Sequence, residues 1–136
     1  MNRTDISRFL LEYEKLQKKV IEVNLKLYES NIDREWYPIS ARDVSSVDKI
    51  EIDEIEAWIY DTTWGWGNSQ HEISTVIPID WLLLSDEDLM KAAKSAKVER
   101  DEESRKKQVE RDRLLKEDTE KREREQYEKL KAKFKE

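Results

Sequence analysis

The residues with the greatest potential for chemistry are the aromatic side chains in the middle of the chain. All five tryptophans lie between residues 36 and 81: Trp36, Trp58, Trp64, Trp66 and Trp81. Two of them stand in the segment Trp64-Gly65-Trp66-Gly67-Asn68, which also holds both glycines of the protein. Indoles on an exposed loop are typical anchors for a binding partner, but they could also fold back over a thin core. The sequence leaves both interpretations open.

Acidic side chains surround these aromatics. Residues 31–90 contain 14 acidic and three basic residues. Glu51, Asp53, Glu54 and Glu56 cluster at one predicted turn, where they could chelate a cation or act as paired acid and base. A solvated polar turn explains the cluster better. The negative field favours a basic protein surface as partner and disfavours nucleic acid, although indoles can stack on bases.

The sequence does not favour an enzyme. It has one histidine, His71, no cysteine, and none of the motifs GxGxxG, GxxxxGK or GxSxG. We therefore expect no catalytic residue, no cofactor and no metal site. A pocket of tryptophans that sequesters a nucleotide stays open as an alternative, with Arg34, Arg42 and Lys49 as the nearby cations.

Residues 47–79 predict a three-stranded antiparallel meander. The strands alternate apolar and polar residues, so Trp58 and Tyr60 should share the face opposite Ile55, Ala57 and Ile59. Gly65 and Gly67 predict the second hairpin loop, and Pro78 predicts an edge position or the end of the last strand. The predicted partner-binding residues are Trp58, Tyr60, Trp64, Trp66, Glu51, Asp53, Glu54 and Glu56.

Residues 5–29 predict an amphipathic helix with an unbroken heptad seam, capped by Thr4 or Asp5. Such a seam needs a covering partner, which could be the sheet, the start of the last helix or a second copy of the chain. For the last case, a homodimer joined as a coiled coil, the self-association residues are Phe9, Tyr13, Leu16, Val20, Val23 and Leu27.

The end of the chain predicts one long, salt-laced helix. Of residues 97–136, 15 are basic and 13 are acidic, and neither glycine nor proline interrupts them. Ser85 is the expected N-cap, and the apolar stripe ends near Ala96. The predicted architecture is α+β: a helix packed on a three-stranded meander, then a long charged helix. We expect residues 1–96 to form a compact α+β body and residues 97–136 a helical extension.

A tryptophan-containing acidic hairpin, the segment IPIDWLLLSDEDL and a charged helix ending in REQYEKLKAKF together resemble small hypothetical proteins encoded by bacteriophages. The resemblance covers the layout of residues 47–136 and brings no assigned site. It implies an accessory protein in the cytoplasm of an infected bacterium that binds and blocks a host factor, such as a defence nuclease.

The function that we expect is therefore a non-enzymatic protein-binding module that inhibits a host protein through an acidic, tryptophan-bearing surface. We expect no association with a membrane, because no apolar run reaches the length of a span. One alternative is a homodimeric assembly protein with the long helix as a spacer, and the nucleotide-sequestering protein is another.

Overall fold

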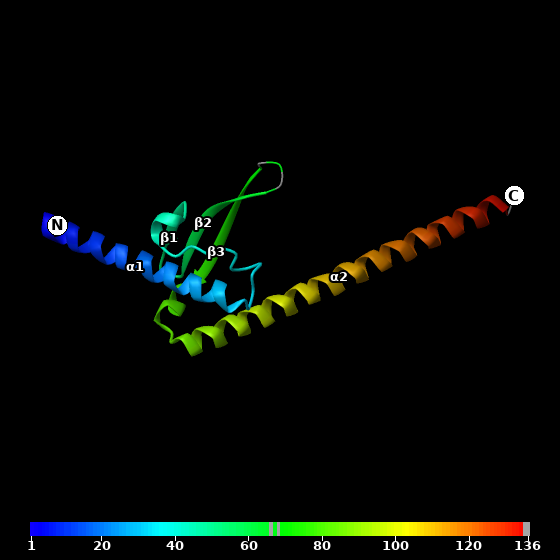
Figure 1. The fold of residues 1–136 in the computed structure, drawn as a ribbon. Coiled ribbons are helices and arrows are strands. Elements are labelled where there is room, and N and C mark those ends of the chain that lie inside the picture. The colour runs from blue at the N-terminus through cyan, green and yellow to red at the C-terminus, as the bar shows by residue number, and fades with distance from the viewer. Residues whose placement is uncertain (66, 68, 135–136) are drawn as a thin grey trace. The chain divides into compact units, whose positions relative to one another are not determined.

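The computed structural model describes residues 1–65, 67 and 69–134, and it confirms the predicted α+β architecture (Figure 1). The sheet is antiparallel with strand order β1-β2-β3. The chain divides into two compact units, Met1–Lys97 and Val98–Glu136. The elements in chain order are α1 (Arg3–Ser30), the 3-10 turn η1 (Val44–Ser46), β1 (Lys49–Ile52), β2 (Glu56–Trp64), β3 (Gln70–Pro78), the 3-10 turn η3 (Ile79–Leu83) and α2 (Asp86–Phe134).

Helix α1 begins at a capping box. Asn2 Oδ1 accepts a hydrogen bond from the Asp5 backbone N–H at 2.9 Å, and Asp5 Oδ2 accepts one from the Asn2 N–H at 3.2 Å. The N-cap is therefore Asn2, and the prediction of Thr4 or Asp5 was wrong: Asp5 takes the reciprocal position three residues later. The helix ends at Ser30, and the C-cap Asn31 closes its last turn with a left-handed φ of 57°.

The sheet has one buried and one open face, because side chains alternate along each strand. Ile50, Ala57, Ile59, Thr75 and Ile77 are buried on the inner face. Asp53 closes the β1–β2 turn by accepting hydrogen bonds from the N–H groups of Ile55 (2.7 Å) and Glu56 (2.8 Å). Pro78 ends β3 at the edge of the sheet, as predicted. In the second hairpin loop Gly67 has a positive φ of 76°, which favours glycine.

The core lies between α1 and the inner face of the sheet. Tyr37 and Ile39, from the connection after α1, are buried and complete one side of it. Asn24 holds this connection in place, since its Nδ2 donates to the Ile39 carbonyl at 2.9 Å. The apolar core residues are Val20, Ile21, Val23, Leu27, Tyr37, Ile39, Ile50, Ala57, Ile59, Ile77, Leu82, Leu89 and Ala93.

Helix α2 buries only its first turns. Ser85 Oγ accepts from the Asp88 N–H at 3.2 Å, which confirms the expected N-cap, and Leu89 and Ala93 are buried. Lys26 of α1 pairs with Asp86 at 2.7 Å, and their hydrogen bond raises the pKa of Lys26 and lowers that of Asp86. Every residue from 101 to 134 is exposed, as expected of a helix held by its own charge pairs.

Candidate functional site

The outer face of the sheet is the candidate functional site. We define it by seven residues: Lys49 and Glu51 on β1, Glu56, Trp58 and Tyr60 on β2, and Ser74 and Val76 on β3. In the register of the strands, Trp58 lies between Glu51 and Val76, and Tyr60 lies between Lys49 and Ser74. The alternation of side chains therefore collects two aromatic rings, three charged groups and a valine on one surface.

The two rings at the centre of the outer face are stacked and held by acids. Their centroids are 6.1 Å apart and their planes differ by 10°. Trp58 Nε1 donates to Glu56 Oε1 at 2.9 Å, and the Tyr60 hydroxyl donates to Glu51 Oε2 at 3.3 Å. Because each ring is fixed by a carboxylate, the aromatic surface is preorganised and would lose little conformational entropy on binding.

A hollow of ≈ 250 Å³ lies beside Trp58. Its lining residues are Glu35, Trp36, Trp58, Ser74 and Val76. Trp36 comes from the connection after α1, and 42% of its surface is exposed. The hollow thus combines two indoles and a valine with a carboxylate, which suits a side chain that has both an apolar stem and a positive charge.

A second hollow, of ≈ 510 Å³, lies beside Tyr60 and is mainly acidic. It is lined by Asp48, Lys49, Glu51, Tyr60 and Glu72. Lys49 Nζ pairs with Glu51 Oε1 at 2.5 Å and lies 5.9 Å from the centre of the Tyr60 ring. This ion pair raises the pKa of Lys49 and lowers that of Glu51. Three acids against one lysine leave a charge of −2 in this hollow, so it would attract a further cation.

The structure brings together four of the predicted partner-binding residues, Glu51, Glu56, Trp58 and Tyr60. Asp53 instead shapes the β1–β2 turn, and hydrogen bonds from the N–H groups of Glu56 and Ile55 lower its pKa. Glu54 is exposed in the same turn. Trp64 ends β2, 67% exposed, at a register position on the same face as Trp58. Trp66 lies outside the described residues.

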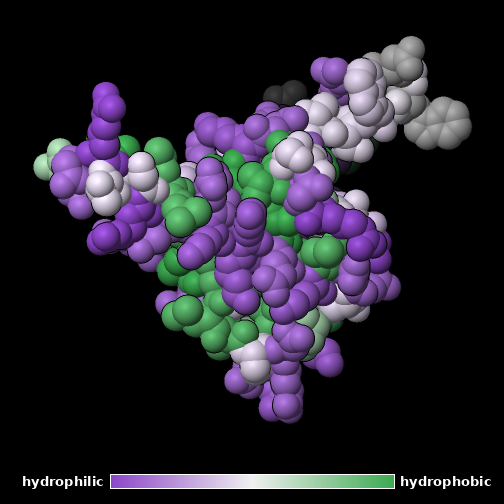
Figure 2. Space-filling model, turned by 60° about the vertical axis from the view of Figure 1, so that its left-hand side comes forward, coloured by the Kyte–Doolittle hydropathy of each residue, from purple (hydrophilic) through white to green (hydrophobic). Residues whose placement is uncertain are grey.

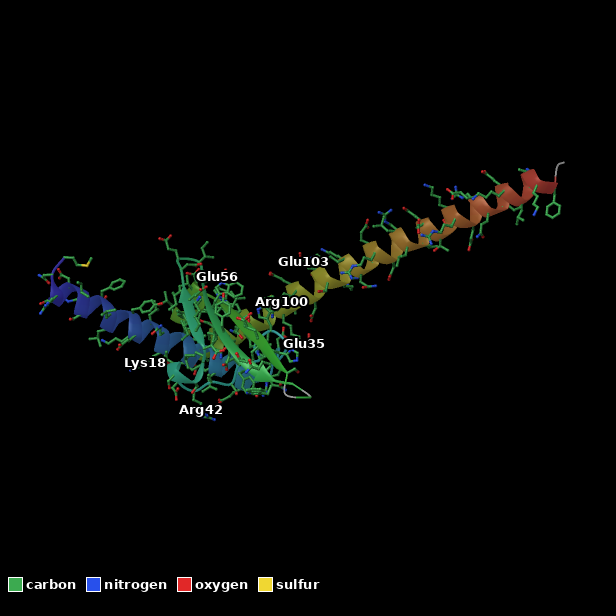
Figure 3. The ribbon with its side chains drawn as sticks, turned by 90° about the horizontal axis from the view of Figure 1, so that it is seen from above. Lys18, Glu35, Arg42, Glu56, Arg100 and Glu103 are labelled. Atoms are coloured by element: carbon green, nitrogen blue, oxygen red, sulfur yellow. The ribbon has the colours of Figure 1, made fainter. Side chains whose placement is uncertain are left out.

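Seven residues that line the two hollows are not among the predicted partner-binding residues: Glu35, Trp36, Asp48, Lys49, Glu72, Ser74 and Val76. From the sequence, Lys49 is expected only as a nearby cation for a nucleotide. The register of the predicted meander could have placed Glu72 and Val76 beside the rings, since they alternate with the inward-facing Ile73, Thr75 and Ile77. Glu35 and Trp36 have no such signal, because an irregular connection carries them. Figure 3 labels Glu35 and Glu56 among the side chains around the sheet.

The predicted self-association residues are divided by the fold. Val20, Val23 and Leu27 are buried in the core of their own chain and are not available to a second copy. Leu16 and Tyr13 are half-buried, and Phe9 is 66% exposed. The C-terminal half of the seam is therefore covered by the core of its own chain, whereas Phe9 in the N-terminal half is exposed.

His71, the one histidine of the sequence, stands at the start of β3. His71 Nε2 lies 3.2 Å from Ser69 Oγ, and a Cβ added at Gly65 would meet the His71 ring at 2.8 Å. This histidine thus packs in the hairpin loop. Among the described residues, no group of three or more histidine, cysteine, aspartate or glutamate side chains could hold a metal ion. Neither helix, over its described length, is apolar enough to cross a membrane.

Comparison of the chain with protein-family models, curated proteins and solved structures finds no match.

Proposed function

We propose that this chain is a non-enzymatic protein-binding module that holds a basic partner against the outer face of its sheet. The observation that carries this proposal is the fixed pair Trp58 and Tyr60 between two acid-bearing hollows. An aromatic face attracts Arg and Lys through the ring quadrupole, and surrounding carboxylates strengthen that attraction.

Contacts of this kind, between a cation and an aromatic ring, also occur within the chain. The Arg34 guanidinium carbon lies 3.8 Å from the centre of the Tyr28 ring, and the Lys49 ammonium lies over Tyr60. Basic side chains of a partner could make the same contacts with Trp36 and Trp58 in the smaller hollow. The larger hollow would take a second cation between Asp48 and Glu72.

We further propose that the partner is a host protein which the module inhibits by covering a basic functional surface. This part rests on the resemblance to small bacteriophage proteins and on the acidic charge of residues 31–90. A basic channel that binds nucleic acid is the kind of surface that such a face would block by competition.

The test begins with capture of partners from bacterial lysate at low and high salt, followed by titration of the purified partner. Replacing both Trp58 and Tyr60 by alanine should weaken binding at least tenfold, because interface aromatics carry a large share of binding energy. Leu83→Ala is the matched control: Leu83 is apolar, 88% exposed and outside the outer face. Circular dichroism would show whether each variant remains folded.

A pair of charge reversals separates the local field from net charge. Glu72→Lys changes an acid that lines the larger hollow, whereas Glu102→Lys makes the same change of net charge in α2. We expect only Glu72→Lys to weaken binding strongly and to reduce its salt dependence. Equal effects of the two reversals, or full binding by the folded Trp58/Tyr60 double variant, would refute the outer face as the binding site.

A further inference from the structure

The N-terminal half of α1, residues 3–19, carries an apolar strip that is exposed at Ile6, Phe9 and Leu10 and half-buried at Tyr13 and Leu16. In Figure 1 this half projects beyond the sheet. Ile6, Phe9 and Leu10 are 46%, 66% and 54% exposed, although they are large apolar residues. Figure 2 turns this end of the helix toward the viewer, and hydrophobic residues lie at the surface there among hydrophilic ones.

This surface continues the seam that is buried further along the same helix. Ile6 and Tyr13 take heptad position a, and Phe9 and Leu16 take position d. Leu16 packs against the edge of the core, and from Val20 onward the same seam is fully buried in it. The open part therefore extends from Ile6 to Tyr13, with Leu16 at its edge, and it has the heptad spacing that packs against another helix.

We propose that a second copy of this chain covers residues 3–19 of α1 and that the two helices run antiparallel. The inference is independent of the outer face of the sheet. A parallel pairing is excluded by the fold, because the second α1 would run into the core elements packed on Val20, Val23 and Leu27. An antiparallel pairing sends the buried half of the second copy beyond Met1, away from the first body.

The length of the open surface matches an antiparallel overlap. When Ile6 faces Leu16 of the second copy, Phe9 faces its Tyr13, and positions a and d form mixed layers. In this register Arg3 and Lys19 of the second copy lie at the same level along the axis, but at positions e and g on opposite sides of the seam. The overlap therefore begins where the helix begins and stops one residue before Val20, the first buried residue of α1.

The flanking charges also suit this register. Positions g of two antiparallel helices face each other, so Asp5 lies near Lys19 of the second copy, and symmetry makes this pair twice. Leu10 at position e meets its own counterpart and extends the apolar strip. The repulsive contact is at the centre, where Glu12 faces Glu12 of the second copy. Two attractive pairs and one repulsive pair favour a dimer of modest affinity.

The first experiment measures the mass of the full chain in solution by sedimentation over a wide range of concentrations. We expect a reversible monomer–dimer equilibrium. Phe9→Glu should raise the dissociation constant at least tenfold, because it places a charge in the seam. Leu11→Glu is the matched control, since Leu11 is 53% exposed and lies off the seam. Phe9 is exposed in the single chain, so its replacement should leave the body folded.

The second experiment reads the orientation. The chain contains no cysteine, so single cysteines report contacts without a background. A mixture of Ile6→Cys and Leu16→Cys chains should oxidise to a disulfide between positions 6 and 16. In the antiparallel dimer two copies of position 6 stand about 15 Å apart along the axis, too far for a disulfide.

Glu12→Gln gives a third readout, because it removes the central repulsion and should tighten an antiparallel dimer. A chain that stays monomeric at every concentration would overturn the proposal, even if residues 3–19 then bound lipid vesicles or another protein. Equal dimerisation of Phe9→Glu and wild type, or efficient disulfide formation by Ile6→Cys alone, would also overturn it.

Discussion

Two polar side chains in the core, Asn24 and Thr75, each bury an oxygen that has no hydrogen-bond partner among the described residues. Asn24 and Thr75 are buried polar residues on facing elements, α1 and β3. Asn24 uses its Nδ2 to hold Ile39, but Asn24 Oδ1 and Thr75 Oγ1 have no hydrogen-bond partner among the described residues. A buried polar atom without a partner costs about 1–3 kcal/mol, so these two atoms weaken the body.

Replacing Thr75 by valine should raise the free energy of unfolding by about 1 kcal/mol, because the change removes an unpaired hydroxyl and keeps the β-branched shape. Urea denaturation would measure the change. Thr63→Val, at an exposed position of β2, is the control and should alter stability by less than about 0.5 kcal/mol. A loss of stability in Thr75→Val would mean that the hydroxyl has a partner, such as a buried water.

At the scale of elements, the β1–β2 turn depends on one carboxylate. Asp53 accepts two backbone N–H bonds, and these lower its pKa from the ordinary value of 3.8. A lowered folded-state pKa means that the carboxylate stabilises the fold above the ordinary pKa. This contribution is lost as the pH falls through the folded-state pKa. The turn is therefore sensitive to acid, although no core residue there titrates.

Asp53→Ala should lower the melting temperature near neutral pH, since the Ile55 and Glu56 N–H groups lose their acceptor. The difference from wild type should shrink at acid pH well below 3.8, as the wild-type carboxyl becomes protonated and gives up its role as acceptor. Thermal unfolding followed by circular dichroism at both pH values would test this. Glu54→Ala changes the neighbouring exposed acid and should have little effect. A difference that does not depend on pH would assign the effect of Asp53 to backbone propensity instead.

The elements were predictable where a pattern repeats. Alternation in residues 47–79 was enough to predict the sheet and the face shared by Trp58 and Tyr60, and Ser85 was enough to predict the start of α2. Neither signal reaches into the connection after α1, which brings Trp36 to the outer face through tertiary packing. The cap of α1 was also missed, because Asn2 and Asp5 act as a pair and sequence reasoning considered single residues.

At the scale of the whole molecule, the two halves of α2 differ in burial and in what stabilises them. Leu89 and Ala93 belong to the core, whereas residues 101–134 are exposed on all sides. The exposed half is held by pairs such as Arg113, whose guanidinium contacts Glu110 at 2.5 Å and Glu117 at 2.8 Å. These contacts are local to the helix, so they stabilise the helix without contributing to the core.

Ending the chain after Asp101 should therefore leave the body folded. This truncation keeps Leu89 and Ala93, and it keeps Lys97, whose Nζ donates to the Ile32 carbonyl at 3.0 Å. We expect the free energy of unfolding to change by less than about 1 kcal/mol, because no buried side chain is lost. Urea denaturation followed by tryptophan fluorescence would measure it, since all five tryptophans lie in the retained part.

Ending the chain after Ser85 is the matched comparison, because it also removes Leu89 and Ala93. Loss of a buried leucine side chain alone costs about 2–5 kcal/mol, a large part of the stability of a domain this small. The shorter chain should consequently be unfolded or show exposed apolar surface, with tryptophan emission close to that in urea. If both truncated chains unfold, the exposed half of α2 contributes to the stability of the body. If both stay folded, Leu89 and Ala93 contribute less to the core than their burial implies.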